Sequence, residues 1–321
     1  MKSIRKLWMS CLLLCAAVLA AILVQGDMVE KIRLPARCRL IGATYATLSD
    51  PFYEVINDEI QMQVKSRGDL LLVREPGRDQ ARQNQEIQEL LDKGIELLVV
   101  NPVDYEGVRP ALEKARQKGV PVILIDSKVN DPGLVTCTIR SNNYGAGLLD
   151  VRHLISQTKA ANIVLLSDSN SFSSWDRLSG FCQTLTRSGN QYRILELRDC
   201  GGQLEQAMQA MKQLLNTYDQ IDVVMAVSEQ MALGAMAALA ESGKLSAIRV
   251  YSVDGSPEAK SLIAEGMMTA TSAQSPLRIG RTAAEIVYEI LEDRPFLSDV
   301  VVPVTQITAE DISRFGTEGW Q

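Results

Sequence analysis

The chain is poor in the residues that most enzymes and nucleotide-binding proteins need. Its 321 residues include one histidine, and aromatic side chains make up 5% of them. No Ser-His-Asp set can be assembled without His153, which falls in an amphipathic stretch where a surface or core role is expected. The sequence has no phosphate-binding loop of the Walker type, and Gly145-Ala146-Gly147 is too weak a motif to indicate a nucleotide site. We therefore expect no enzymatic activity, no catalytic residue and no cofactor.

Cysteines are also few, and their spacing does not suit a metal. Beyond the first 26 residues the cysteines are Cys38, Cys137, Cys182 and Cys200, and no two of them have metal-ligand spacing. Cys182 and Cys200 are the more plausible disulfide pair if the protein is exported, but buried free thiols are equally compatible with a domain of this size. No metal site is predicted.

The N-terminal residues combine positive charge with an apolar run. Lys2, Arg5 and Lys6 precede the run from Leu7 to Val24, which has no charged residue over about 18 positions and is long enough to cross a bilayer. Since the positive flank stays inside, everything after it should be extracytoplasmic, at the cell surface or in the periplasm. We interpret residues 1–26 as an uncleaved membrane anchor, with a cleaved signal segment and then a lipoprotein signal as alternatives, and residues 27–38 as a tether.

Acidic residues outnumber basic ones in the exported part. Removing residues 1–26 takes away three basic side chains and no acidic ones, which leaves 30 basic against 39 acidic and a net charge of −9. This balance argues against nucleic acid as a partner.

Short apolar runs alternate with amphipathic stretches along the rest of the chain. The runs are rich in Val, Ile and Leu and apolar on both faces, which is typical of buried parallel strands. The amphipathic stretches have apolar residues three and four apart, as in Ile87, Leu90 and Leu91. Strands are expected at 39–46, 70–73, 97–100, 120–125, 163–166, 194–197, 223–227 and 248–253. Helices are expected at 52–66, 80–93, 105–118, 144–156, 178–188, 204–216 and 231–242. The alternation predicts an α/β fold with doubly wound parallel sheets.

The strand and helix pattern occurs twice, with a period of roughly 125 residues. The third and fourth strands end at Asn101 and Asp126 in the first run, and the corresponding strands end at Ser228 and Asp254 in the second. Ligands of open parallel sheets bind beyond the carboxyl ends of the strands. We therefore expect two lobes that enclose a small polar molecule between them.

The last part of the chain has too few elements for a third domain. It contains a strand candidate at 269–273, a long helix at 276–291 and an extended run at 299–304. We expect the chain to cross back, add a helix to the first lobe and return, which with a crossing near 139–142 gives a three-segment hinge. The predicted lobes are residues 39–140 with 275–298, and residues 141–274 with 299–321.

Two adjacent aromatic residues follow the first predicted strand. Pro51 with Asp50 or Ser49 is an ordinary helix start. It does not account for Phe52 and Tyr53 at the mouth of the sheet in a chain this poor in aromatics. An aromatic face stacks well on the apolar face of a sugar ring, so we consider this segment a candidate binding wall.

Polar side chains at the other strand ends complete a candidate site. Asp126 and Asp254 stand at equivalent positions of the repeat, and a carboxylate can accept hydrogen bonds from two vicinal hydroxyls. The guanidinium of Arg177 would donate hydrogen bonds to the same ligand. Gln274 could reach the cleft from a segment predicted to cross between the lobes. Trp175 could form a second stacking wall or pack on its own lobe.

Six motifs stand out over about residues 39–305. They are Ser49 to Tyr53, Ile95 to Pro102, Val122 to Asp126, Glu229 to Ala235, Val253 to Pro257 and Ala270 to Pro276. Together they resemble the type I periplasmic sugar-binding proteins, most closely the ribose-binding protein group. The resemblance implies a two-lobed fold joined by a hinge, and it is more specific for the fold than for the ligand.

The resemblance also implies a set of ligand contacts. Ser127 stands where the family often has an arginine, and it is included as a candidate. Gly201-Gly202 falls where an aromatic residue is expected, so ribose itself is in doubt and a related sugar or polyol remains open. The implied contacts are Asp50, Phe52, Tyr53, Asn101, Asp126, Arg177, Ser228, Asp254 and Gln274.

The function expected from the resemblance is that of an extracytoplasmic solute-binding receptor. It would close on a sugar or polyol and present the closed form to an ABC-type permease or to a membrane sensor kinase. One alternative is an exported sugar-acting enzyme that uses Asp126 and Asp254 as paired carboxylates, and another is an interaction protein that binds no ligand. The same fold forms the effector half of lactose-repressor-type regulators, but here an apolar segment stands where their helix-turn-helix would be.

Overall fold

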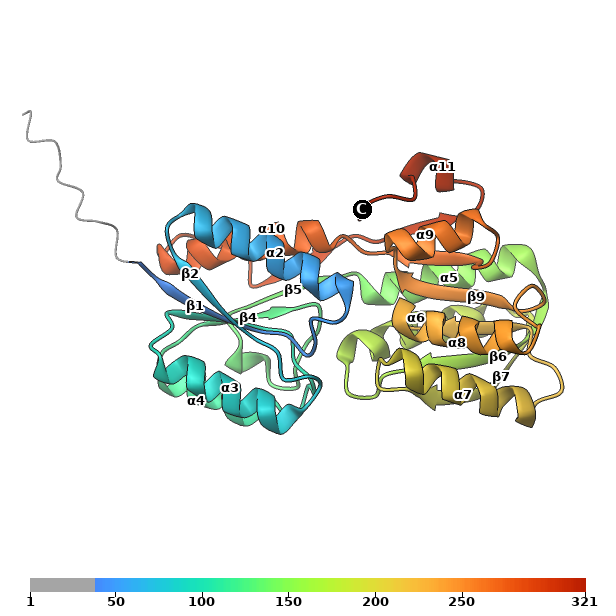
Figure 1. Ribbon diagram of the computed structural model, residues 1–321, viewed down its shortest axis with the longest axis horizontal. Helices are drawn as coiled ribbons and strands as arrows, with labels where there is room; N and C mark the ends of the chain where they lie inside the picture. Colours follow the sequence, from blue (N-terminus) through green and yellow to red (C-terminus); the bar gives the residue numbers. More distant parts are fainter. Residues whose placement is uncertain (1–37) are drawn as a thin grey trace, which may run out of the picture. The chain divides into compact units, whose positions relative to one another are not determined.

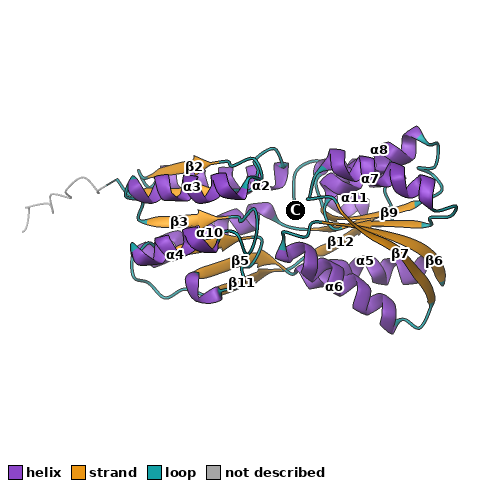
Figure 2. Cartoon of the chain, turned by 90° about the horizontal axis from the view of Figure 1, so that it is seen from below, coloured by secondary structure: helices purple, strands orange, loops and turns teal. Residues whose placement is uncertain are grey.

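Two six-stranded sheets, each with helices on both faces, make up the part of the chain that the structure describes, residues 38–321 of a computed structural model (Figures 1 and 2). We call each sheet with its helices a lobe. The predicted anchor and almost all of the predicted tether lie outside the described residues. Within residues 38–321, no helix is both long and apolar enough to cross a membrane.

The first lobe is built on a sheet with the strand order β11-β5-β4-β3-β1-β2, and all its strand pairs are parallel. Its strands are β1 (Leu40–Thr44), β2 (Leu70–Arg74), β3 (Leu97–Val100), β4 (Val122–Ile125), β5 (Cys137–Ser141) and β11 (Asp299–Val302). Its helices are α2 (Pro51–Ser66), α3 (Gln80–Asp92), α4 (Arg109–Gln117), the short 3-10 helix η1 (Pro132–Leu134) and α10 (Pro276–Leu291).

The second lobe is built on a sheet with the order β12-β10-β9-β8-β6-β7, in which β10 and β12 are antiparallel. Its strands are β6 (Ala160–Ser167), β7 (Gln191–Asp199), β8 (Val223–Ala226), β9 (Arg249–Asp254), β10 (Ala270–Ala273) and β12 (Thr305–Thr308). Its helices are α5 (Asn143–Gln157), α6 (Phe172–Arg187), α7 (Leu204–Thr217), α8 (Glu229–Glu241), α9 (Pro257–Ala264) and α11 (Ile312–Phe315).

The two strand orders correspond position by position. Strand β4, which precedes Asp126, holds the third place in its sheet, and β9, which ends at Asp254, holds the same place in the other. The chain passes between the sheets three times: between β5 and α5, between β10 and α10, and between β11 and β12. The prediction of two doubly wound lobes with three connecting segments is therefore confirmed.

One predicted boundary is wrong. Residues 299–321 were assigned to the second lobe, but β11 pairs in register with β5 of the first sheet, from Asp299 with Thr138 to Val302 with Ser141. A four-residue apolar strand can complete the edge of either sheet, and its own pattern does not tell which sheet lies nearer. Strands β5 and β12 were not predicted as strands, because both are short and carry polar residues.

The end of the chain also returns to the first lobe. The ring of Trp320 lies edge-on to Phe52 of α2, with ring centroids 5.9 Å apart, and joins the first lobe's apolar cluster. Just before it, the ammonium of Lys260 in α9 donates a hydrogen bond of 2.7 Å to the carbonyl of Gly319. The last residues therefore contact both lobes.

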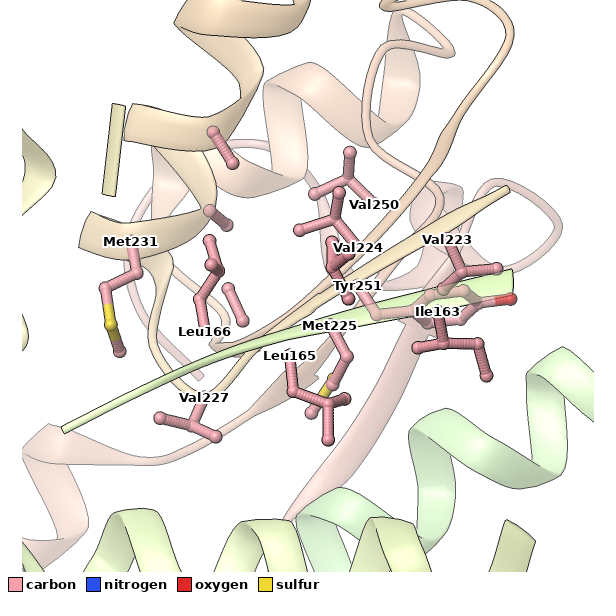
Figure 3. Packing of buried hydrophobic residues seen from close by; sticks show 14 of the residues in the cluster. Ile163, Leu165, Leu166, Val223, Val224, Met225, Val227, Met231, Val250 and Tyr251 are labelled. Carbon is pink, nitrogen blue, oxygen red and sulfur yellow. The ribbon is translucent and has the colours of Figure 1, made fainter. Parts of the chain in front are cut away.

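The core consists of three apolar clusters, one in the second lobe and two on the opposite faces of the first sheet. In β3, Leu97 and Val99 face one of these clusters while Leu98 and Val100 face the other. Both faces of the sheet are covered by helices, so the central strands β3 and β4 are apolar throughout instead of alternating. Figure 3 shows the second-lobe cluster, where β6, β8 and β9 contribute side chains such as Leu165, Val224 and Val250.

Candidate ligand-binding site

A cavity lies where the loops after the strands of both sheets meet, and residues of both lobes line it. About 50 Å³ of it is open to the centres of water-sized molecules. Since a cavity needs roughly 10–15 Å³ of such space to hold one water, this cavity can hold more than a single water. Its lining consists of Asp50, Phe52, Tyr53, Arg78, Asp126, Asp168, Ser171, Ser173, Ser174, Arg177, Gly202, Val227, Ser228, Met231, Asp254 and Gln274.

Eight of the ten predicted site residues are in this lining. They come from the loop after β1 and the start of α2, from the ends of β4, β8, β9 and β10, and from α6. They are Asp50, Phe52, Tyr53, Asp126, Arg177, Ser228, Asp254 and Gln274.

Asn101 and Ser127 do not line the cavity. The Asn101 side chain accepts a hydrogen bond of 3.2 Å from the backbone N–H of Ala46 and donates one of 3.3 Å to the carbonyl of Ile125. It therefore braces the ends of three neighbouring strands beside the site. Ser127 is buried next to Asp126, and its backbone N–H donates to the carbonyl of Ile125.

Arg177 joins the two carboxylates at the centre of the site. Its guanidinium lies 3.7 Å from a carboxylate oxygen of Asp126 and 3.8 Å from one of Asp254. Two short hydrogen bonds fix its orientation, from Nε to Asn143 Oδ1 at 2.8 Å and from Nη1 to the carbonyl of Val227 at 2.7 Å. One buried cation is thus shared by one carboxylate from each lobe.

Both aspartates have unusual backbone conformations. Asp126 has φ 67° and Asp254 has φ 145°, a region that residues other than glycine seldom adopt. Such strain is often found at functional sites, where the surrounding structure holds it in place. Here the conformations turn each chain sharply at the end of its buried strand, and both carboxylates face the cavity.

Hydrogen bonds from buried polar groups hold the Asp254 carboxylate in place. Its carboxylate accepts hydrogen bonds from Gln274 Nε2 at 2.6 Å and from the backbone N–H of Glu229 at 3.0 Å. The Glu229 carboxylate in turn accepts from the N–H of Gly255 at 2.6 Å and from the Thr271 hydroxyl at 2.9 Å. Burial raises the pKa of Asp254 well above its usual range, and Arg177 opposes that shift; burial also raises the pKa of Glu229 to about 7.

The start of α2 supplies the first lobe's wall. Asp50 caps this helix by accepting a hydrogen bond of 3.0 Å from the N–H of Phe52, and Pro51 occupies the first turn. The Tyr53 hydroxyl donates to Asp126 Oδ2 at 3.0 Å, and its ring lies edge-on to Phe52 with centroids 5.3 Å apart. Burial raises the pKa of Asp50, and the N–H of Phe52 and the positive charges of Arg78 and Arg177 oppose that shift.

Three polar atoms of the lining residues are buried without a hydrogen-bond partner. They are Asp126 Oδ1, Ser228 Oγ and Gln274 Oε1. A buried polar group left unpaired costs about 1–3 kcal/mol. Two of the three atoms can only accept, so donor groups of a ligand, such as hydroxyls, would suit them.

Sequence reasoning missed several lining residues. Arg78 and Asp168 follow the second strand and the first strand of their lobes, and Ser171, Ser173 and Ser174 lie at the start of α6. The rule that ligands bind beyond the carboxyl ends of strands could have indicated these loops, but not which of their side chains would turn inward.

The structure places the remaining candidates elsewhere. Trp175 is 42% exposed, donates from Nε1 to the carbonyl of Ser169 and does not line the cavity. His153 is half-buried with Nδ1 3.0 Å from the Tyr251 hydroxyl, as expected for a structural histidine.

Cys182 and Cys200 are free thiols, and burial raises the pKa of Cys200 to about 11. Among residues 38–321 no cluster of histidine, cysteine and carboxylate side chains is arranged to hold a metal ion.

Comparison with known families identifies this architecture. Residues 41–295 match the model of the family described as periplasmic binding protein domain. The chain belongs to this family. The resemblance proposed from the sequence motifs is thereby confirmed. Membership of the periplasmic binding protein family implies an extracytoplasmic location and the role of a solute-binding receptor.

Relatives of this periplasmic binding protein include proteins of known ligand. It is 27% identical over 266 residues to the ribose import binding protein RbsB of Bacillus subtilis (strain 168). The aligned residues cover 82% of this chain and 85% of the relative. It is 27% identical over 254 residues to the RbsB protein of Escherichia coli (strain K12), covering 78% and 84%.

Solved structures show the same fold. An ABC transporter solute binding protein from Mycobacterium smegmatis with bound glycerol superposes with a TM-score of 0.82 at 27% identity, covering 88% of this chain and 99% of the other. The Caulobacter myo-inositol binding protein superposes with a TM-score of 0.81 at 22% identity, covering 86% and 95%.

Proposed function

We propose that the cavity between the lobes binds one small sugar or polyol and that the lobes close around it. The arrangement that carries the proposal is Arg177 held between Asp126 and Asp254, with unpartnered acceptor atoms beside it. A hydroxylated ligand would donate to these acceptors and receive hydrogen bonds from the guanidinium. Binding would stabilise the closed form through contacts that exist only when both lobes meet the ligand.

The ligand class follows from the chemistry of the lining and from the relatives. The lining offers carboxylates, an amide and hydroxyls with one aromatic wall, which suits a compact ring or chain with several hydroxyls. The relatives named above bind ribose, and the solved structure at 27% identity contains glycerol. We propose a pentose or a small polyol.

We propose that an ABC-type permease is the partner that recognises the closed form. A membrane sensor kinase is the second candidate, and the apolar segment from Leu7 to Val24 favours it, because a receptor held at the membrane could signal from a fixed position. We further propose that this segment is an uncleaved anchor.

A thermal-shift screen of residues 27–321 against monosaccharides and polyols tests the ligand proposal. A ligand present at 100 times its dissociation constant should add about 2.7 kcal/mol to the free energy of unfolding. Asp254→Asn should abolish the shift, because the neutral amide weakens the attraction to Arg177 and presents a donor where the site needs an acceptor.

Asp92→Asn is the matched control, since Asp92 is an exposed partner of Lys118 far from the lining. Circular dichroism checks that both variants are folded. A shift retained in Asp254→Asn would contradict the site, and product formation from a bound sugar that is lost in Asp126→Asn would favour the alternative of a sugar-acting enzyme.

A further inference from the structure

Arg78 extends from the first lobe to the second at the edge of the site. Its Nη1 donates a hydrogen bond of 3.1 Å to the carbonyl of Gly201, and its Nη2 donates one of 3.1 Å to the carbonyl of Gly202. Asp168 Oδ2 lies 4.0 Å from the same guanidinium. One side chain of the first lobe thus bonds to two backbone groups and faces one carboxylate of the second lobe.

The backbone holds Arg78 in this position. The residue has φ 64°, and its N–H donates a hydrogen bond of 2.7 Å to the carbonyl of Ala46 in the loop after β1. A left-handed conformation is uncommon for a residue with a long side chain. The observed outlier therefore points to a role for the side chain at this place.

The opposite surface leaves room for the guanidinium. A Cβ atom on Gly202 would lie 2.8 Å from Arg78 Nη1 and 3.1 Å from Asp168 Oδ2. Gly202 also has φ 67°, which an L side chain would strain. Glycine at this position permits the close approach of the two lobes.

The same arginine borders the site and two larger spaces. A neighbouring cavity of about 430 Å³ is lined by Arg78 and Gly202, among others, and another of about 260 Å³ by Arg78 and Gly201. Arg78 lines all three spaces. Arg78 therefore borders the site and both of the neighbouring spaces.

Two other contacts between the lobes lie outside the site cavity. Lys128 pairs with Asp176 at 2.8 Å, and the rings of Tyr105 and Phe172 lie 4.6 Å apart. None of these four residues lines the site cavity. They can hold the lobes together without limiting what the cavity admits.

We propose that Arg78 is a specificity-determining residue that closes the cleft over Gly201-Gly202 and limits the ligand to one that fits on its inner side. Its hydrogen bonds to the second lobe need no ligand, so they favour closure of the ligand-free protein as well. A sugar that carries a further substituent in the direction of Arg78 is excluded because the guanidinium occupies that space. The size limit rests on the proposed function, whereas the effect on closure does not.

Hydrogen–deuterium exchange of the full chain without ligand tests the closure. In Arg78→Ala, peptides that cover residues 76–80 and 199–204 should exchange about tenfold faster, because charge-assisted hydrogen bonds across the cleft are lost. Peptides from β3 and β8 should be unchanged if the fold is intact. Arg82→Ala is the control, since Arg82 pairs with Glu86 of its own helix. Unchanged exchange at both cleft segments of Arg78→Ala would overturn the proposal, whatever the ligand is.

A second arm tests the size limit by thermal shift with D-ribose, myo-inositol, methyl β-D-ribofuranoside and sucrose. Arg78→Ala should respond to at least one of the two glycosides, which carry a substituent that D-ribose lacks, whereas the unaltered protein and Lys128→Ala should give no shift with either. A response by Lys128→Ala to the same glycosides would show that loosening the lobes is sufficient and would contradict the role of Arg78. If no compound shifts any variant, the proposed ligand class fails, and the exchange measurement still decides whether Arg78 closes the cleft.

Discussion

At the scale of single residues, buried carboxyl groups outside the site link the fold to pH. Asp150 in α5 is fully buried, and its Oδ1 accepts hydrogen bonds of 2.9 Å from Ser272 Oγ and from Gln306 Nε2. Its Oδ2 has no hydrogen-bond partner. Burial raises the pKa of Asp150 to about 8, and the hydrogen bonds from Gln306 and Ser272 and the charge of Arg177 oppose that shift.

The raised pKa of Asp150 predicts a pH-dependent effect of Asp150→Asn. An unfolded aspartate has a pKa near 3.9. Between that value and about 8 the folded state binds the additional proton, so the contribution of this group to stability falls as pH rises, by at most about 1.4 kcal/mol per unit. The variant lacks this loss, so its free energy of unfolding relative to the unaltered protein should increase from pH 5 to pH 8. Urea denaturation at both values measures this, and a constant difference would contradict it.

Some residues of the site could be predicted from the sequence, and others could not. Asp126 and Asp254 could be predicted because each comes at the end of a buried strand in a repeated pattern. Arg78 could not, because only the folded chain brings its loop opposite Gly202.

At the scale of elements, the terminal segment after α11 is the least expected part of the fold. Trp320 packs on Phe52, which itself lines the site, and on the first lobe's apolar cluster. Nothing in the local sequence indicates this contact, since residues 309–321 have no sustained period. A segment that belongs to the second lobe by chain order thus supports the wall of the first.

Trp320→Ala should therefore affect both stability and binding. Removing the partly buried indole should cost about 1–3 kcal/mol of the free energy of unfolding, because apolar area returns to water and Phe52 loses its neighbour. Chemical denaturation measures the loss, and a titration with the ligand from the screen measures the affinity, which should fall as well. Leu297→Ala is the control, since that side chain is 68% exposed. Equal effects of the two changes would show that the tryptophan contact is not part of the folded structure in solution.

At the scale of the whole molecule, the lobes and the N-terminal segment differ in charge and hydrophobicity. Residues 39–321 contain the two sheets, the apolar clusters and the site. The net charge of residues 27–321 is negative. The segment from Leu7 to Val24 contributes no charge and about 18 apolar or small positions, so hydrophobic transfer into a bilayer is its expected role.

The anchor proposal predicts where the full chain is found after expression in bacteria. It should stay in the membrane fraction after a carbonate wash, because the apolar segment is held by the hydrocarbon core and not by charge. A chain that starts at residue 27 behind a cleavable export signal should be released with the soluble extracytoplasmic fraction. If expression of the full chain instead yields a soluble extracytoplasmic product whose mass corresponds to loss of the first 20 to 26 residues, the segment is a cleaved signal.

The sequence by itself determined the two α/β halves, their repeated succession of strands and helices and the carboxylates at the strand ends, because hydrophobic period and strand-end position are local properties of the chain. The tertiary structure alone decided that β11 completes the first sheet, that Trp320 returns to α2 and that Arg78 faces Gly202. Each of these depends on which segments, distant in the chain, come to lie side by side. A local pattern fixes which face of an element is apolar, but the choice among equally apolar or equally polar neighbours is made by the packing of the whole chain.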